Sequence, residues 1–163
     1  MKNLKMLFCV IGILMSTVAF CQTNLPNITL KDLNGKSYNL ARYNSSDKPV
    51  IISFWATWCG PCIKELKAIN EVYGNWQKEF GVELVAVSID DARTKSRVKP
   101  QVSGAGWKYT VLLDDNHELK RAMNVVNVPY TIIMYKGKVM FKHANYTPGI
   151  ENEIYRELKS LKK

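Results

Sequence analysis

Residues 50–62 read VIISFWATWCGPC, and the architecture of the chain can be worked out from this stretch. The apolar run through Ala56 predicts a buried central strand, because strands covered on both faces are nearly continuous in hydrophobic residues. Two cysteines, Cys59 and Cys62, follow it with only Gly-Pro between them. Helical periodicity begins directly afterwards, so the order strand, tight turn and helix is expected, with one cysteine at the start of the helix.

The predicted helix extends from Cys59 to Phe80, and Gly81 is the type of residue that ends a helix. Its apolar stripe recurs at steps of four and three: Cys62, Leu66, Ile69, Tyr73, Trp76 and Phe80. Cys62 therefore belongs to the buried face, whereas Cys59 lies at the mouth of the helix. A helix N-terminus stabilises a thiolate. We therefore expect Cys59 to attack a disulfide and Cys62 to resolve the mixed disulfide.

Two other interpretations of the cysteine pair are weaker. A structural zinc site needs two further ligands, and the only histidines, His117 and His143, are far apart in the sequence. A structural disulfide between cysteines so close together closes little chain and contributes little loop entropy. Disulfide exchange is therefore the favoured chemistry, and no metal or bound cofactor beyond the Cys59–Cys62 disulfide is expected.

Residues 1–21 are predicted to be a signal peptide, and residues 22–163 the folded domain. A basic start is followed by an apolar run of roughly 15 residues, which is short for a membrane span. Cleavage after Cys21 is favoured, and the alternatives are a lipidated Cys21 or an uncleaved anchor. Phe20 argues against lipidation, because that position usually holds a small residue. The expected location is the periplasm, with membrane tethering in either alternative.

Export makes the cysteine count informative. Of the four cysteines, Cys9 and Cys21 lie within the predicted signal peptide, so the mature chain keeps only Cys59 and Cys62. An exported protein with a single pair of this kind has no framework of structural disulfides. Its disulfide chemistry is therefore confined to the site.

Composition predicts one domain of ordinary size, about 140 residues after signal removal. Without the two lysines of the signal, 21 basic residues stand against 14 acidic ones. The basic residues are not concentrated as nucleic-acid binding would require, so no nucleic-acid partner is expected. One local cluster occurs at Arg93, Lys95, Arg97 and Lys99, and a solvated face explains it better than an acidic or membrane partner.

Turn signals and periodicity place the other elements. Strands are expected at Ile28–Asp32, Lys36–Leu40, Val82–Ile89, Tyr109–Leu113, Thr131–Tyr135 and Val139–His143. A short helix capped by Asp115 or Asn116 and a last helix with Pro148 at its first position complete the pattern. Residues 92–106 are ambiguous, because Pro100 should interrupt a helix there. The order predicts an α/β fold, a mixed sheet with helices on both faces and an N-terminal β-hairpin.

Residues 54–62, FWATWCGPC, followed by Val128-Pro129 before a strand, resemble thioredoxin. The N-terminal hairpin, the segment at residues 92–106 and the predicted export signal make the chain similar to the exported TlpA/ResA-type thiol-disulfide oxidoreductases of bacteria. The resemblance covers essentially the whole mature chain. It implies the thioredoxin fold, a cis peptide at Pro129, and Val128 offering backbone groups to an extended substrate segment. It also implies that a groove is lined by Trp58, Gly60 and Pro61.

One departure from thioredoxin concerns the buried acid. Thioredoxin has an Asp six residues before its first cysteine, and Ser53 stands at that place here. Members of the TlpA/ResA group often carry a Glu three residues after the second cysteine, and Glu65 fits this pattern. Helix geometry puts Glu65 at the edge of the buried stripe, where it is expected to take the proton of Cys62 during resolution.

The leading hypothesis is a reductase of protein disulfides that depends on an upstream electron donor at the membrane, and a monomer is expected. The Gly-Pro dipeptide matches thioredoxin and so favours a potential near its roughly −270 mV. Two alternatives stay open: a disulfide oxidant or isomerase, and a non-catalytic module that binds peptides in the groove beside Pro129. Replacement of Cys59 by alanine distinguishes the binding module from an enzyme, because peptide binding would persist whereas disulfide exchange would be lost.

Overall fold

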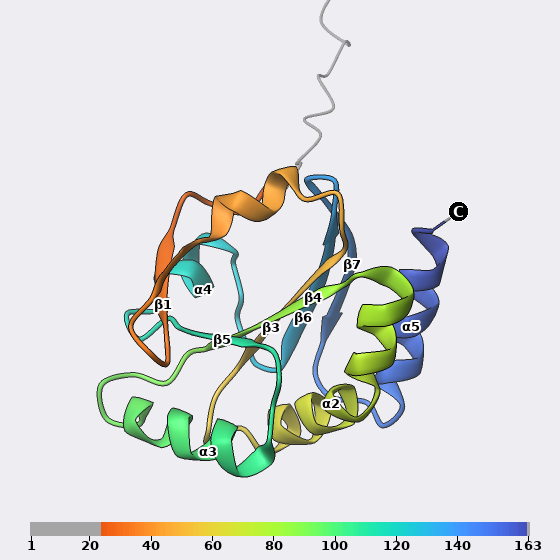
Figure 1. Cartoon of the computed structure of the whole chain (residues 1–163). Coiled ribbons are helices and arrows are strands. Elements are labelled where there is room, and N and C mark those ends of the chain that lie inside the picture. The colour runs from red at the N-terminus through yellow and green to blue at the C-terminus, as the bar shows by residue number, and fades with distance from the viewer. Residues whose placement is uncertain (1–23, 163) are drawn as a thin grey trace, which may run out of the picture.

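The computed structural model describes residues 24–162, whose strands form one mixed sheet in the order β2-β1-β5-β4-β3-β6-β7 (Figure 1). The strands are β1 (Thr29–Asp32), β2 (Ser37–Asn39), β3 (Val50–Trp55), β4 (Glu83–Ser88), β5 (Thr110–Leu113), β6 (Tyr130–Tyr135) and β7 (Lys138–Ala144). The helices are η1 (Leu40–Ser45), α2 (Gly60–Phe80), η2 (Lys95–Arg97), α3 (Val98–Ala105), α4 (Glu118–Ala122) and α5 (Ile150–Ser160). The predicted signal peptide lies outside the described residues.

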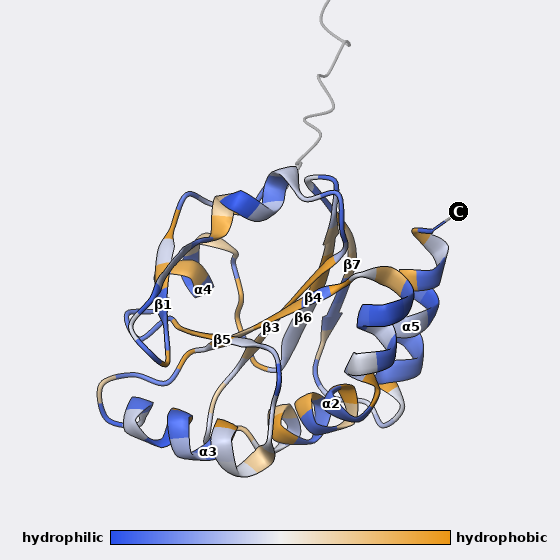
Figure 2. Ribbon diagram, viewed as in Figure 1, coloured by the Kyte–Doolittle hydropathy of each residue, from blue (hydrophilic) through white to orange (hydrophobic). Residues whose placement is uncertain are grey.

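Strand β3 is an interior strand of the sheet, as its continuous hydrophobicity predicts. All six of its residues are buried, and it pairs in parallel with β4 and antiparallel with β6. The apolar colouring of the central strands against the polar outer helix surfaces is visible in Figure 2. The expected α/β class, with a mixed sheet and an N-terminal hairpin, is therefore confirmed.

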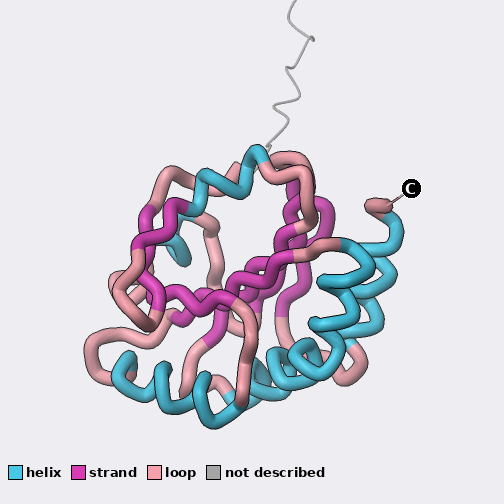
Figure 3. The backbone as a smooth tube through the Cα atoms, in the orientation of Figure 1, coloured by secondary structure: helices cyan, strands magenta, loops and turns pink. Residues whose placement is uncertain are grey.

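Helices cover both faces of the sheet (Figure 3). Helices α2 and α3 lie along one face, because two right-handed crossovers follow each other in the same direction, from β3 to β4 and then to β5. Helix α5 packs beside α2 on that face, and α4 and η1 lie on the other (Figure 1). Within residues 24–162, no helix combines the length and the apolar character that crossing a bilayer requires.

Helix α2 begins and ends where the sequence predicts. Cys59 is its N-cap, and Gly81 ends it in the left-handed conformation, at φ 66°, with its N–H donating to the carbonyl of Gln77. The predicted apolar stripe is buried except for Phe80, which is partly exposed. This rigid helix fixes the position of both cysteines.

Three local expectations were wrong. Pro100 does not interrupt a helix: it lies in the first turn of α3, where a backbone N–H has no intrahelical partner. Asp114, rather than Asp115 or Asn116, caps α4, since its carboxylate accepts from the N–H groups of Leu119 and Lys120 at 3.1 and 2.8 Å.

The third concerns the last helix. Gly149, at φ 87°, precedes the first residue of α5, so Pro148 lies outside the helix instead of opening it.

Candidate active site

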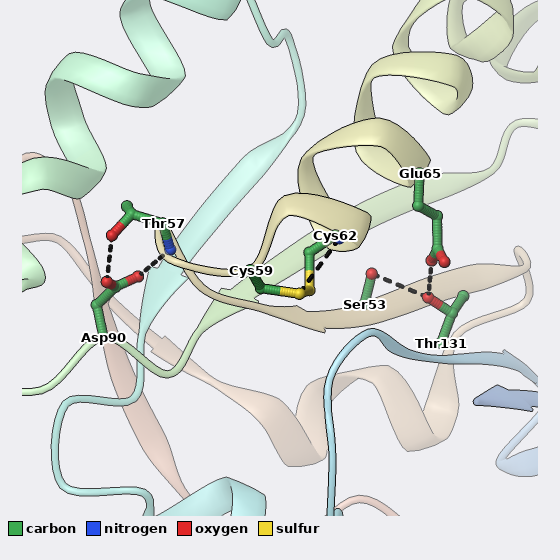
Figure 4. The surroundings of a disulfide bond; sticks show 7 residues. All are labelled: Ser53, Thr57, Cys59, Cys62, Glu65, Asp90 and Thr131. Carbon is green, nitrogen blue, oxygen red and sulfur yellow. Dashed lines mark hydrogen bonds between the residues drawn. A yellow bond between two sulfur atoms is a disulfide. The ribbon is translucent and has the colours of Figure 1, made fainter. Parts of the chain in front are cut away.

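Cys59 and Cys62 form a disulfide at the start of α2 (Figure 4). Their Cα atoms are 5.3 Å apart, and the N–H of Cys62 donates to Cys59 Sγ at 3.2 Å. Cys62 is 0% exposed and Cys59 6%. Cys59 is therefore the more exposed of the two cysteines, as predicted. It is less exposed, however, than we expected of a residue at the mouth of a helix. A thiolate at Cys59 would face the N–H groups of the first helical turn.

The loop that leads to Cys59 is held by a buried acid. Asp90, which follows β4, accepts hydrogen bonds from the N–H of Thr57 at 2.8 Å and from its hydroxyl at 2.5 Å. Ser88 Oγ donates to the same carboxylate at 2.8 Å. Because Thr57 lies two residues before Cys59, these contacts fix the backbone that leads to Cys59 Sγ (Figure 4).

Sequence reasoning assigned no chemistry to Asp90. Its only sequence signal is its place directly after a buried parallel strand, where functional loops are common. In the structure, Asp90 holds the loop that leads to Cys59.

Glu65 lies deeper than the edge position that helix geometry predicts. It is 0% exposed, and Oε1 lies 2.6 Å from the hydroxyl of Thr131 on β6. That hydroxyl lies 2.9 Å from Ser53 Oγ on β3, and both partners are buried (Figure 4). Burial raises the pKa of the Glu65 carboxyl above its ordinary value of 4.5. Hydrogen bonding by Thr131, the charge of His143 and hydrogen bonding by Ser53 act in the opposite direction.

The Val128–Pro129 peptide is cis, as the resemblance implied. Pro129 directly precedes β6, whose first residue, Tyr130, pairs with Phe54 near the end of β3. The proline therefore lies at the sheet edge from which the Cys59 loop departs. Pro129 is buried and Val128 half-buried.

The residues expected to line a groove are open to solvent. Trp58 is 58% exposed, and Gly60 and Pro61 are exposed beside it. This arrangement leaves an exposed apolar rim next to the disulfide.

The two histidines differ in their surroundings. His117 Nε2 lies 2.8 Å from the carbonyl of Ile89, which accounts for it as a structural residue. His143 is half-buried, and its Nε2 has no hydrogen-bond partner among the described residues. Among residues 24–162, no three His, Cys, Asp or Glu side chains gather in a way that could hold a metal ion.

Comparison with known proteins identifies relatives of this chain. A family model described as AhpC/TSA matches residues 21–149. The thiol-disulfide oxidoreductase ResA of Bacillus thuringiensis subsp. konkukian is 36% identical over 116 residues, or 71% of this chain and 64% of that protein. The chain thus spans slightly less than two thirds of that relative. ResA of Bacillus subtilis is 30% identical over 145 residues, covering 84% of this chain and 78% of that protein.

Solved structures give the same picture. The solution structure of an uncharacterized thioredoxin-like protein from Porphyromonas gingivalis has a TM-score of 0.73 and 47% identity, covering 84% of this chain and 90% of that one. A putative thiol:disulfide interchange protein DsbE from Chlorobium tepidum also has a TM-score of 0.73, over 84% of this chain and 94% of that one. Its 22% identity supports the fold alone.

Proposed function

The chain belongs to the AhpC/TSA family and has a thioredoxin-like fold, and from this premise we propose that it is a thiol-disulfide oxidoreductase that reduces protein disulfides. The observation that carries the proposal is the Cys59–Cys62 disulfide at the N-terminus of α2. Its more accessible sulfur belongs to the N-cap residue, and its partner is enclosed in the core. Such a pair suits attack by Cys59 and release by Cys62.

In the proposed reaction, the thiolate of Cys59 attacks one sulfur of a substrate disulfide. A mixed disulfide forms, and the other substrate sulfur leaves as a thiolate. Cys62 then loses its proton to Glu65 and attacks Cys59 Sγ, which breaks the mixed disulfide and releases the second substrate thiolate. The enzyme ends as the disulfide seen in the structure, so a separate electron donor must reduce it again.

The surface around the disulfide fits an extended protein segment. In the proposal, Val128 and Pro129 present backbone to the substrate, and the exposed rim of Trp58, Gly60 and Pro61 packs against its side chains. In this arrangement the substrate segment passes beside the exposed part of Cys59. These roles follow from the resemblance and from the shared sheet edge described above.

The site of action proposed is outside the cytoplasm. The support is the signal-like sequence of residues 1–21, and the alternatives of cleavage, lipidation at Cys21 or an uncleaved anchor remain as the sequence leaves them. A donor at the membrane would keep the pair reduced in a compartment that oxidises thiols.

The first experiment is equilibration of the protein with glutathione and dithiothreitol buffers, with the fraction of Cys59–Cys62 disulfide read by alkylation. A potential near or below roughly −250 mV supports a reductase. A potential above roughly −180 mV overturns this direction and makes the protein an oxidant or isomerase. If the wild-type protein binds disulfide-containing peptides but does not reduce them, it is a binding module instead.

A further inference from the structure

The chain between β4 and β5 concentrates positive charge. Residues 92–108, hereafter the basic segment, contain no Asp or Glu. Their basic side chains are all exposed: Arg93, Lys95, Arg97, Lys99 and Lys108. By sequence alone a solvated face accounts for such a cluster, but only the fold decides what that face lies beside.

Both ends of the basic segment are attached to the part of the chain that carries Cys59. At its beginning, Asp90 accepts hydrogen bonds from the N–H and the hydroxyl of Thr57. At its end, the ring of Trp107 packs edge-on against Trp55, with ring centroids 4.8 Å apart. Because Trp55 and Thr57 precede Cys59 by only four and two residues, the basic segment borders the cysteine loop.

The middle of the basic segment is fixed as well. Val98 and Val102 of α3 are buried, so one side of this helix packs on the core. Gly106 ends the helix in the left-handed conformation, at φ 63°. The exposed cations are therefore carried by an ordered element and keep their positions relative to the site, as recognition of a partner requires.

Only part of this charge is balanced within the protein. Arg93 pairs with Asp91 at 2.9 Å, and Lys95 pairs with Asp115 at 2.6 Å. No ion pair within residues 24–162 involves the other three cations: Arg97, Lys99 and Lys108. Unbalanced positive charge beside a site attracts negatively charged partners and repels positively charged ones.

The rim around the disulfide does not select partners by charge. Residues 57–63 and 122–131, which include Trp58 and the cis proline, contain no Lys, Arg, Asp or Glu. A bound substrate segment is extended, at about 3.3 Å per residue, so residues several positions from its reacting cysteine lie beyond this rim. Selection by charge therefore falls to the neighbouring basic segment.

The attachment of the N-terminal residues argues against a membrane surface as the partner. The N–H of Leu25 donates to Asn44 Oδ1, and Asn44 Nδ2 donates to the Leu25 carbonyl, both at 2.8 Å. The Asn44 carbonyl lies against Gly137, in the turn between β6 and β7. That turn is at the opposite end of β6 from Pro129. A chain anchored through residues 1–21 would therefore hold the basic segment away from the bilayer (Figure 1).

We propose that the basic segment selects protein substrates whose target disulfide is flanked by acidic residues. This inference rests on the proposed function and adds a substrate class to it. The exchange steps at Cys59 and Cys62 are unchanged. The unpaired cations attract the acidic flank during encounter and orient it, which raises the association rate more than the rate of the bound complex. The effect should therefore appear in kcat/KM, with little change in kcat.

The test measures reduction of three peptides that share one disulfide and differ only in flanking residues, which are acidic, neutral or basic. Dithiothreitol is the donor, because it is uncharged and does not depend on the basic segment. Wild type should reduce the acidic peptide with the highest kcat/KM and the basic peptide with the lowest. The preference should vanish near 1 M salt, where the Debye length is about 3 Å.

The decisive variant replaces all three unpaired cations by glutamine: Arg97→Gln, Lys99→Gln and Lys108→Gln. An exposed ion pair contributes up to roughly fivefold in affinity, so the ratio of kcat/KM for the acidic to the neutral peptide should fall by about tenfold. The matched control removes the same charge at the opposite end of the sheet: Lys48→Gln, Lys136→Gln and Lys138→Gln. In this control the ratio should stay as in wild type.

Equal kcat/KM for the acidic and neutral peptides in wild type, or an equal fall of the ratio in the control, would overturn the inference. Binding of wild type to phosphatidylglycerol vesicles without any peptide preference would identify a membrane surface instead. If the glutamine variant fails to fold, the salt dependence of wild type and a charge-keeping variant with Arg97→Lys and Lys99→Arg decide, since both should keep the preference. Reduction of all three peptides at equal rates rejects this inference alone, whereas reduction of none rejects the proposed function.

Discussion

Replacement of Glu65 by glutamine should change how stability depends on pH. Burial holds the pKa of Glu65 above 4.5 in the folded state, against the effects of Thr131, His143 and Ser53. The folded state therefore binds this proton more tightly than the unfolded state. Its contribution to stability is fully present below pH 4.5 and is lost as pH rises through the folded-state pKa. A neutral glutamine carries no such loss.

The size of the effect follows from linkage. Between the unfolded and the folded pKa, one carboxyl costs up to about 1.4 kcal/mol of stability per pH unit. The glutamine variant should therefore gain stability relative to wild type as pH rises, whatever the packing cost of the substitution itself. The charge of His143 favours the ionised carboxylate, so the pH range over which this stability is lost is narrower than burial alone would make it.

The assay is guanidinium unfolding of the oxidised protein at several values between about pH 4.5 and 8, since in the oxidised form neither Cys59 nor Cys62 has a thiol to titrate. Glu71→Gln is the matched control, because Glu71 is an exposed glutamate on the same helix. If the difference in free energy of unfolding between wild type and Glu65→Gln stays constant across this pH range, the pKa of Glu65 is not raised. That result would also refute the role of Glu65 as proton acceptor.

Three further results are expected. Cys62→Ala should trap a mixed disulfide between Cys59 and a substrate, visible by mass spectrometry, whereas Cys59→Ala should trap none; equal trapping would contradict the assigned roles. Asp90→Asn should lose about 2 kcal/mol of stability and slow disulfide exchange, because an amide cannot accept all the hydrogen bonds of Thr57 and Ser88, whereas Asp91→Asn should change little. Gly137→Ala should destabilise more than Gly35→Ala in thermal unfolding. Both have positive φ, which costs about 1–2 kcal/mol, but only at Gly137 does the new Cβ meet backbone, 2.6 Å from the Asn44 oxygen. Equal losses at the two glycines would argue against that contact.

The strand, turn and helix around the cysteines could be predicted because their signals are local. The continuous hydrophobicity of Val50–Ala56, the stripe of α2 and Gly81 each depend on neighbours within a few turns of chain. The same applies to the order of accessibility, which follows from the helical phase of Cys59 and Cys62. The cis peptide at Pro129 came from the resemblance, not from local physics.

Capping residues were less predictable, because several side chains compete for the same N–H groups. Asp114, Asp115 and Asn116 are all suitable caps by type, and the path of the chain after β5 selects Asp114. Pro100 was misjudged for a related reason, since its effect depends on where α3 begins.

The depth at which Glu65 lies was decided by the tertiary structure. Helix geometry placed Glu65 at the edge of a stripe, but β6 covers that edge with Thr131, which lies 66 residues away in the chain. Asp90 reaches Thr57 across 33 residues in the same way. The sequence by itself determined the elements and the redox pair, because periodicity and capping act over a few residues. Only the packing of distant strands against α2 decided which carboxyl is buried and what it contacts, because burial depends on which surfaces meet.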